Sequence, residues 1–366
     1  MKHAKEEKKK GGFFRKLFRF IGCVLLLAVL AFGGLIAWLT AAEYSPDETI
    51  ALETAGEASK TLSKGDSIRM MSWNMGYGAL GDNADFFMDG GSGVMTADKA
   101  RVESNLQGIT EEIAKNDPDI LFLQEIDENS KRSYNIDETA LLKEKLAGYS
   151  SAFAYNYKVP FVPYPVPPLG KINSGIMTFS EYPMENCERI QLPISFSWPV
   201  RTANLKRCLL VSRIPVSGSS NELVLINLHL EAYDSGEGKI AQTAQLIDFL
   251  NEEYKKGNYV IAGGDFNQIF SSAKADLYPA QEGKWAAGII DVSGAEGSWN
   301  FIMDETVPSC RSLDQPYAGA DKEGFQYYLI DGFIVSGNIK VNEFKNRDLG
   351  FVCSDHNPVT MDITLD

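Results

Sequence analysis

Residues 258–267 read NYVIAGGDFN, an apolar run that stops at two glycines and is followed by Asp265 and Asn267. A short apolar run of this kind, bounded by turn-forming residues, is typical of a buried strand that ends in a turn. A polar side chain at the end of a buried strand sits on a rigid backbone and is well placed to line a pocket. Asp265 taken alone would most often cap a turn, so its meaning depends on the rest of the chain.

The same pattern recurs on both sides of this stretch. Five other apolar runs carry or adjoin a polar residue, and they are IRMMSWN (68–74) with Asn74, DILFLQE (119–125) with Glu125, ELVLINLHL (222–230) with His229, YYLIDGFIVS (327–336) with Asp331, and NPVTMDITL (357–365) after Asp355 and His356. Each residue alone means little, because asparagine is common in turns and glutamate is common at surfaces. The set as a whole indicates a pocket lined by strand ends.

Further segments complete the predicted fold. Strands are expected at NSGIMTFS (173–180), which begins at Asn173, and at LKRCLLVSR (205–213). Helical periodicity covers residues 97–115 and 238–254. Strands that dominate in two halves, with helices outside them, predict an α/β fold in which two stacked sheets lie between helices.

Histidine is scarce in this chain, which narrows the choice of catalytic groups. Of the three histidines, His3 lies close to the N-terminus, whereas His229 and His356 both lie beside predicted strand ends. If catalysis requires an imidazole, these two residues are the only candidates.

The N-terminal part is predicted to anchor the chain in a membrane. Residues 1–19 carry eight Lys or Arg, and residues 20–42 contain no charged side chain. Those 23 residues span about 34 Å as a helix, enough to cross a hydrocarbon core of about 30 Å. The charge asymmetry places the basic tail in the cytoplasm and the bulk of the chain outside, on a single-pass plasma-membrane anchor. Cleavage after Thr40-Ala41-Ala42 is the alternative.

Beyond the anchor, residues 43–66 are polar and predict a tether, and residues 67–366 form the expected catalytic domain. Without residues 1–19 the chain has 27 basic and 47 acidic residues, a formal charge of −20. A domain this acidic will not hold polyanions by bulk attraction, so a phosphate substrate requires local recruitment, most simply through a bound cation. Cys187 and Cys208 are compatible either with a disulfide or with separate buried thiols.

Six short motifs occur in the order SWN (72–74), LFLQE (121–125), NLHL (227–230), GGDFN (263–267), LIDGFIV (329–335) and SDHNPV (354–359). In this order they resemble the motif series of the endonuclease/exonuclease/phosphatase superfamily, over roughly residues 67–366. The resemblance implies a four-layer α/β/β/α sandwich of two packed mixed sheets flanked by helices. It also implies metal-dependent hydrolysis of a phosphoester.

The resemblance assigns roles to the motif residues. Glu125 would be the main ligand of a divalent cation, Mg²⁺ with Mn²⁺ as a substitute, and Asn74 and Asp355 would lie on the metal side. Asn74 and Asn173 would contact the substrate.

Catalytic roles fall on the remaining motif residues. They are Asp265 and Asn267 holding the attacking water, His356 at the phosphate with Asp331 orienting it, and His229 as general acid for the leaving oxygen. Whether Asp265 or His356 is the base stays open at this level.

The substrate class is the least constrained expectation. Arg201, Lys206, Arg207 and Arg213 are the one basic concentration in the catalytic domain, and they weakly favour nucleic acid. The apolar, proline-rich stretch VPFVPYPVPPLG (159–170) suits an interfacial loop of a sphingomyelinase-like or phospholipase-C-like enzyme, and equally a rigid connection. A non-catalytic binding module is disfavoured because every motif residue is present. No protein partner is predicted.

Overall fold

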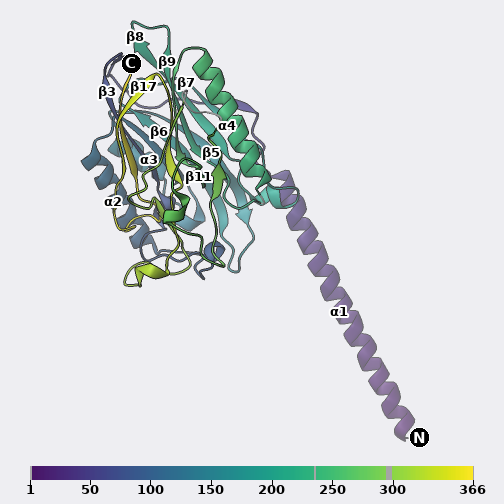
Figure 1. Ribbon diagram of the computed structural model, residues 1–366. Helices are drawn as coiled ribbons and strands as arrows, with labels where there is room; N and C mark the ends of the chain where they lie inside the picture. The colour runs from purple at the N-terminus through teal and green to yellow at the C-terminus, as the bar shows by residue number, and fades with distance from the viewer. Residues whose placement is uncertain (1, 235, 294–298, 366) are drawn as a thin grey trace.

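The computed structural model describes residues 2–234, 236–293 and 299–365. A long first helix, α1 (Lys2–Ala41), projects from a folded body that contains the rest of the chain (Figure 1). Its segment Phe13–Ala41 is long and apolar enough to cross a membrane, by length and composition. The side chains of residues 1–12, which hold part of the predicted cytoplasmic tail, lie outside the described part of the chain.

The body is built on two mixed sheets. The first has six strands in the order β17 (Ile339–Asn346), β18 (Val359–Leu365), β3 (Ser67–Asn74), β4 (Ile120–Asp127), β6 (Gly170–Ser180) and β5 (Ser150–Val162). Its only parallel pair is β3 with β4, among the strands described. Because β3 and β4 run in the same direction, the polar ends of IRMMSWN and DILFLQE meet at one edge of the sheet.

The second sheet has eight strands. Its order is β1 (Thr49–Ala51), β7 (Glu185–Gln191), β8 (Cys208–Ser217), β9 (Glu222–His229), β10 (Tyr259–Asp265), β16 (Asp331–Ser336) and β13 (Trp299–Ile302), with β2 (Leu62–Ser63) beside β8. Two small pairs lie outside both sheets, and they are β11 (Gln268–Phe270) with β12 (Gly288–Ile290) and β14 (Cys310–Arg311) with β15 (Tyr327–Tyr328). The parallel pair β9 and β10 ends at the site described below.

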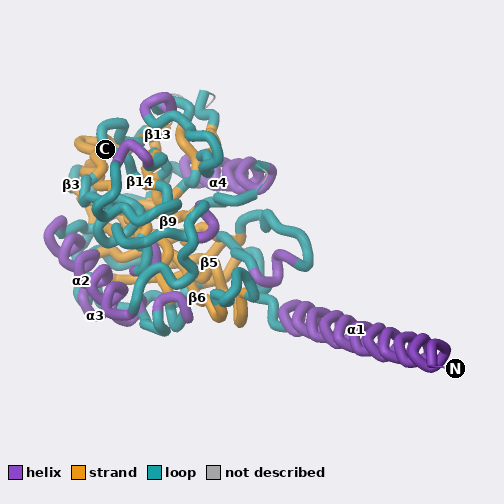
Figure 2. The backbone as a smooth tube through the Cα atoms, turned by 90° about the horizontal axis from the view of Figure 1, so that it is seen from below, coloured by secondary structure: helices purple, strands orange, loops and turns teal. Residues whose placement is uncertain are grey.

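Three hydrophobic layers hold the four structural layers together. Met70 and Phe122 of the first sheet pack against Leu225 and Phe333 of the second in the central layer. Helices α2 (Lys99–Asn116) and α3 (Glu138–Lys145) cover the outer face of the first sheet, and α4 (Glu237–Lys255) covers that of the second. Figure 2 shows α2 and α3 on one side of the strands and α4 on the other. The predicted four-layer sandwich of two packed sheets flanked by helices is therefore confirmed.

Residues 43–66 differ from the predicted tether. Within them β1 pairs antiparallel with β7, and β2 pairs parallel with β8. The physical reason is that β7 and β8 offer free backbone groups at the rim of the second sheet, which a short segment satisfies whatever its side chains. The segments TIA (49–51) and LS (62–63) are too short to carry a period of two in the sequence.

Three strands of seven or more residues, β5, β7 and β17, were not anticipated. Each has polar or charged residues on its exposed face, and β5 and β17 are the two edges of the first sheet. Their apolar alternation is therefore weak. β5 also extends to Val162, so the stretch 159–170 begins as a strand and becomes a loop only beyond it.

The cysteines are separate thiols. Cys187 in β7 and Cys208 in β8 are buried, and neither these two nor the other three cysteines of the chain form a disulfide. Of the two alternatives left by the sequence, the structure shows buried thiols, and both side chains belong to the central hydrophobic layer.

Glu253, near the end of α4, gives the folded state a defined pH dependence. Its carboxylate accepts hydrogen bonds from Arg213 (2.8 and 3.0 Å), Lys256 (2.7 Å) and Asn258 (2.8 Å). Burial opposes its charge, but these three donors outweigh burial and lower the pKa from 4.5 to about 2. Because the folded-state pKa is depressed, this contribution to stability is present above the unfolded pKa. It is lost as pH falls towards about 2.

We therefore expect Glu253→Gln to reduce the free energy of unfolding by about 2 kcal/mol at pH 7, since hydrogen bonds to a charged group are lost. The difference from the unmodified protein should shrink as pH falls from 4.5 towards about 2. Urea denaturation of the full chain in detergent at several pH values measures both. The exposed neighbour Glu252 provides the matched control, because Glu252→Gln should change stability by less than about 0.5 kcal/mol. Equal stability of Glu253→Gln and the unmodified protein at pH 7 would contradict this account.

Candidate active site

Strand register brings three of the predicted site residues side by side. Asp265, the last residue of β10, is directly opposite His229 at the end of β9 and opposite Asp331 at the start of β16. Directly opposed residues point to the same face of a sheet. The sheet therefore fixes a row of His229, Asp265 and Asp331 with no contribution from loops.

Asp265 is the centre of this group. Its Oδ2 lies 3.5 Å from Nε2 of His229, 3.7 Å from Nε2 of His356 and 3.0 Å from Nδ2 of Asn74. Its other oxygen, Oδ1, accepts a 2.9 Å hydrogen bond from the backbone N–H of Asn267. One carboxylate oxygen is thus held by the turn, while the other faces two imidazoles.

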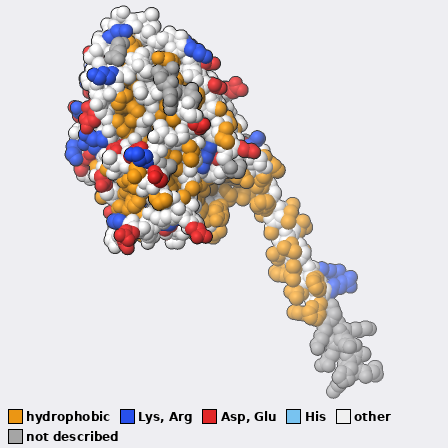
Figure 3. Space-filling model, in the orientation of Figure 1, with side chains coloured by type: hydrophobic (Ala, Val, Ile, Leu, Met, Phe, Trp, Pro, Cys, Tyr) orange, Lys and Arg blue, Asp and Glu red, His pale blue; other side chains and the backbone are white. Residues whose placement is uncertain are grey.

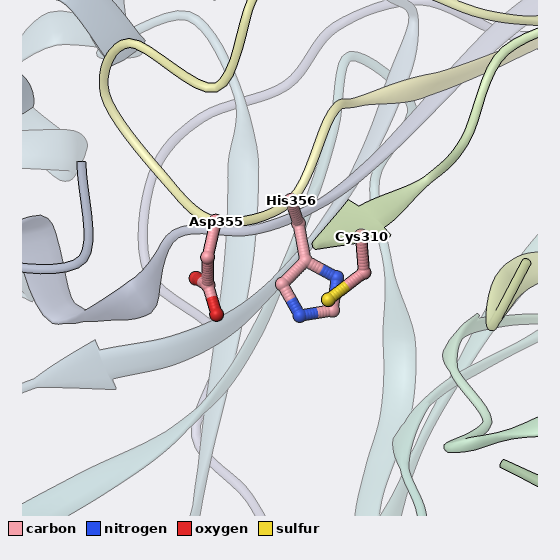
Figure 4. Close-up of side chains that lie close together, drawn as sticks. All are labelled: Cys310, Asp355 and His356. Atoms are coloured by element: carbon pink, nitrogen blue, oxygen red, sulfur yellow. The ribbon is translucent and has the colours of Figure 1, made fainter. Parts of the chain in front are cut away.

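His356 is oriented by Asp331, as the sequence predicts. Its Nδ1 lies 2.8 Å from Oδ2 of Asp331. Burial disfavours a charged ring, but the negative charge of Asp331 and nearby groups outweighs burial and raises the pKa of His356 well above its ordinary value. His356 is therefore an imidazolium at neutral pH. Figure 4 shows it next to Asp355 on the loop before β18, with Cys310 of β14 beside the ring.

Glu125 reaches the site through a break in its strand. The pairing of β4 with β6 shifts register between Leu123 and Ile126, and Glu125 has a φ of 54°, in the left-handed region. A bulge of this kind re-aims a side chain, and a non-glycine residue in this conformation costs of order 1–3 kcal/mol. The amide Nδ2 of Asn74 then donates to Oε1 of Glu125 (3.2 Å), so one amide joins Glu125 to Asp265.

The backbone at the end of β10 requires a glycine directly before Asp265. Gly264 has a φ of 141°, and a Cβ there would collide with the carbonyl oxygen of Leu228 in the neighbouring strand. Asn267, two residues after Asp265, has a φ of 51°. The end of β10 is therefore a strained turn that is held by its hydrogen bonds, as is common at functional sites.

The acidic groups fit a hard divalent cation. Burial and the charge of Asp331 raise the pKa of Asp265 to about 7, and burial and the charge of Glu125 raise the pKa of Asp355 to about 6. Raised values of this kind mark buried carboxylates without enough positive charge nearby, which a cation would supply. Glu125 and Asp355 offer the oxygen ligands that Mg²⁺ and Mn²⁺ prefer.

Two compact groups of potential ligand atoms suit a divalent cation less well. Asp265, Asp331 and His356 have ligand atoms within 4.8 Å of one another, but His356 and Asp331 are already engaged with each other. Cys310, Asp355 and His356 form the second group. Burial raises the pKa of the Cys310 thiol to about 12, so it stays neutral and is a poor ligand for a hard ion.

His229 has a different electrostatic setting from His356. Burial, together with the positive charges of Arg207 and His356, lowers the pKa of His229 well below its ordinary value. Its ring is therefore neutral in the free protein. Nδ1 of His229 has no hydrogen-bond partner among the described residues, and the ring lines the cavity. This differs from a satisfied core histidine, because such a ring would have its nitrogen paired.

The site opens into a cavity of about 630 Å³. Of the predicted site residues, Glu125, His229, Asp265, Asn267, Asp355 and His356 line this cavity. Asn74 and Asp331 lie behind them and are hydrogen-bonded to residues that do. Asn173 is not brought to the site. It lies between Ile172 and Ser174, which do line the cavity, and alternate residues of a strand face opposite ways.

The basic residues singled out in the sequence separate in space. Arg207 lines the cavity and donates to the backbone oxygen of His229 (3.0 Å). Arg213 is bound to Glu253 and Glu222, and Lys206 and Arg201 are both paired with Glu43. Of the four, only Arg207 lines the cavity, and it is also paired, with Glu231 at 3.5 Å.

Sequence reasoning missed several cavity residues. Arg132 is held by two hydrogen bonds to Asp127 and stacks on the ring of Tyr77, with its Cζ 3.6 Å from the ring centroid. Arg311 and Asp89 also line the cavity. Burial, together with the charge of Asp355, raises the pKa of Asp89 to about 7. Arg132 and Asp89 lie in three-residue 3-10 helices and Arg311 in a two-residue strand, so they carry no periodic signal that would have marked them.

The profile of the Endonuclease/Exonuclease/phosphatase family matches residues 71–311, and the chain belongs to this family. Its members are hydrolytic phosphoesterases that typically use a divalent metal. The resemblance drawn from the motifs is confirmed. The comparison with curated proteins found no significant match.

Solved structures of the family share the fold. An endonuclease/exonuclease/phosphatase from Beutenbergia cavernae DSM 12333 matches with a TM-score of 0.55 and 19% identity, over 82% of this chain and 72% of that one. A family protein from Bacteroides vulgatus gives 0.54 and 14%, over 82% and 100%. The human Nocturnin catalytic domain with bound sulfate gives 0.50 and 18%, over 86% and 97%. At these identities the likeness concerns the fold alone.

Proposed function

We propose that this protein is a divalent-cation-dependent phosphoester hydrolase held at a membrane by α1. The observation that carries the proposal is the convergence on Oδ2 of Asp265, which faces His229 on one side and His356 on the other at 3.5 and 3.7 Å. In this arrangement Asp265 can accept a proton, His356 can contact the phosphate as a cation, and His229 can serve the leaving oxygen.

Glu125 and Asp355 would hold the cation, which would neutralise charge on the phosphate oxygens. Asn74 serves as a positioning group in this proposal. Its Nδ2 donates to Glu125 and Asp265, while its Oδ1 accepts from the backbone N–H of Gly76 (3.0 Å). This oxygen is thus already engaged, which argues against the predicted role of Asn74 as a ligand.

The protein's own groups account for the proton transfers. His356 is held as an imidazolium by Asp331, so it contacts the phosphate and is not the base. Asp265, with a pKa raised to about 7 by burial and by Asp331, accepts the proton of the attacking water. His229 lies opposite and donates to the leaving oxygen. Burial and the positive charges of Arg207 and His356 lower the pKa of His229, and an anionic phosphate next to Arg207 would offset the part that is due to these charges, which favours the protonated ring that a general acid requires.

The proposal includes an uncleaved anchor. Leu39 is buried against the body, Trp198 Nε1 donates to Oγ1 of Thr40 (3.0 Å), and Glu43 pairs with Lys206 (2.9 Å). Cleavage after Ala42 would remove the first two of these contacts. They support an anchor that remains part of the folded unit. The charge asymmetry around the span supports the proposal that the catalytic domain lies on the outer side of the membrane.

Protease added to intact cells is expected to degrade the chain beyond residue 43 and to leave the basic N-terminal segment. Detection with one tag at each end distinguishes the two segments. The same protease on lysed cells is the control, where both ends are lost. A domain that resists protease until lysis would reject the outward orientation, and a mature chain that begins near residue 43 would reject the anchor.

The sequence weakly favours nucleic acid as the substrate. That expectation rested on four basic residues, of which Arg201, Lys206 and Arg213 are engaged in ion pairs away from the cavity floor. Because these three residues are already paired, they do not support a nucleic-acid substrate. The shape of the cavity is then the better guide to the substrate class.

A further inference from the structure

The membrane-crossing helix forms part of the wall of the active-site cavity. Ile36 and Leu39 of α1 line the same cavity as His229, Asp265 and His356. Pro199 and Val200, around the short helix η4 (Val200–Ala203), line it next to α1. Figure 3 shows hydrophobic side chains gathered where α1 joins the body. The cavity is therefore continuous from the acidic site to the end of the anchor.

Several contacts fix this end of α1 to the body. Glu43 pairs with Lys206 (2.9 Å), whose ammonium is 2% exposed and also donates to the backbone oxygen of Arg201 (2.6 Å). The rings of Trp38 and Phe161 lie 6.4 Å apart. Trp198 donates to Thr40. With a buried ion pair and packed aromatic side chains here, the body is held at one orientation relative to the helix.

The position of these contacts along α1 sets the height of the cavity mouth. The apolar segment ends at Ala41, so Leu39 and Ile36 lie about 3 and 8 Å before that end at about 1.5 Å per residue. A span of 29 residues is longer than the roughly 20 needed to cross a bilayer. With the proposed anchor in a membrane, these positions put the cavity mouth close to the membrane surface, near the level where lipid headgroups meet acyl chains.

The side chains around the cavity mouth suit the boundary between lipid headgroups and acyl chains. Tyr164 and Val200, which line the cavity, are 68 and 56% exposed, and Val166 and Trp198, two residues away from them in the chain, are 92 and 56% exposed. Aromatic and apolar side chains left open to water are unfavourable on a soluble surface, and tryptophan and tyrosine are enriched where a membrane meets water. The proline-rich stretch 159–170 contributes two of these residues, so its interfacial interpretation gains support over that of a rigid connection.

The polar end of the cavity suits one phosphate group and not a polyanion. Arg207 and Arg311, which are buried, and Arg132, which is partly buried, line the cavity. Arg201 and Lys206 do not line the cavity, and both pair with Glu43. With a charge of −20 outside residues 1–19, the surface repels a long anionic chain but does not prevent a single phosphate from entering the cavity.

We propose that the substrate is the phosphoester of a membrane lipid, which enters from the outer leaflet with its acyl chains along Ile36, Leu39 and Val200 and its phosphate at Asp265. This inference rests on the proposed function and adds the substrate class to it. The oxygen of one water forms a bond to phosphorus and one P–O ester bond breaks. The proton lost by water is balanced by the proton gained by the leaving oxygen, and no electrons are transferred.

The test uses the full-length protein in nanodiscs with Mg²⁺. The discs contain equal parts of phosphatidylcholine, phosphatidylethanolamine, phosphatidylglycerol and sphingomyelin, and loss of each parent lipid is followed by mass spectrometry. Bis(p-nitrophenyl) phosphate in the same preparation reports hydrolysis of a soluble ester, and plasmid DNA and RNA are added in parallel. We expect at least one lipid to be consumed, at a rate above that of either nucleic acid.

Substitutions at the mouth test the route of entry. We expect Tyr164→Asp and Val200→Asp, at two exposed residues that line the cavity, to lower the ratio of lipid to soluble-ester hydrolysis at least roughly tenfold, because a carboxylate is disfavoured at acyl-chain depth. Leu277→Asp is the control, since Leu277 is 45% exposed but does not line the cavity, and the ratio should not change.

Each other outcome has a definite meaning. Hydrolysis of the soluble ester with all four lipids intact overturns the lipid inference and leaves the proposed function standing. Faster cleavage of DNA or RNA than of lipid overturns it as well, and so does an unchanged ratio in both mouth variants. Absence of hydrolysis on every substrate in the presence of Mg²⁺ contradicts the proposed function itself.

Discussion

Removal of divalent cations is expected to lower hydrolysis of bis(p-nitrophenyl) phosphate by at least about 100-fold, and addition of Mg²⁺ or Mn²⁺ should restore it. Stabilisation of developing charge at a preorganised site typically contributes a factor of this size. The physical basis is the set of buried carboxylates whose pKa values are raised by burial and mutual repulsion, Asp265 to about 7 and Asp355 to about 6. Without a cation, an anionic phosphate would be repelled by this group.

A variant of Glu125 and a matched control test whether Glu125 holds the cation. Glu125→Gln should raise the Mg²⁺ concentration needed for half-maximal activity, because one charged oxygen ligand is lost. The fold should be unaffected, since Glu125 is half-buried at a cavity and not in a hydrophobic layer. Glu128→Gln is the matched control, three residues along the chain and outside the cavity, and its Mg²⁺ dependence should match that of the unmodified protein. Activity that is indifferent to chelation would exclude the proposed mechanism.

The second large effect separates the two histidines. Loss of a general acid or base typically costs roughly 10²–10⁴-fold in rate. We expect His229→Ala to lose that much on an ester with a poor leaving group and far less on a nitrophenyl ester, because a good leaving group needs little protonation. His356→Ala should be impaired on both, since its imidazolium acts on the phosphate. Measuring kcat on a series of leaving groups for both variants tests this difference.

Asp331→Asn tests whether Asp331 positions His356 and favours its charged form. The carboxylate of Asp331 lies 2.8 Å from Nδ1 of His356 and favours its charged form. We therefore expect Asp331→Asn, like His356→Ala, to lower kcat on esters with good and with poor leaving groups, but by a smaller factor. Thermal denaturation of each variant shows whether folding is intact. Equal losses for His229→Ala on good and poor leaving groups, with intact folding, would remove His229 from the acid role.

The sequence alone determined most of the central architecture. Apolar runs in β3, β4, β9 and β10 are read correctly because a strand buried on both faces is continuously hydrophobic, which is a local property. The polar residues at their ends were found for the same reason. The long apolar helix α1 also needs no tertiary information, since length and hydropathy define it.

The tertiary structure decided which of these residues meet. The row of His229, Asp265 and Asp331 depends on the register of three strands, two of which are separated by more than sixty residues in the chain. The bulge at Glu125 depends on the pairing of β4 with β6. Asn173 was misplaced because the face of a strand that meets the cavity is set by packing, and a shift of one residue reverses it.

Long-range packing also decided what surrounds the site. Residues 43–66 have the composition of a tether, yet β1 and β2 lie along the second sheet because its rim offers unpaired backbone groups. Arg201 and Lys206 look like a basic patch in sequence, but both pair with Glu43, more than 150 residues earlier. Local patterns therefore determined the strands and their chemical groups. Contacts between distant segments decided that α1 forms a wall of the cavity, because such contacts leave no periodic trace in the sequence.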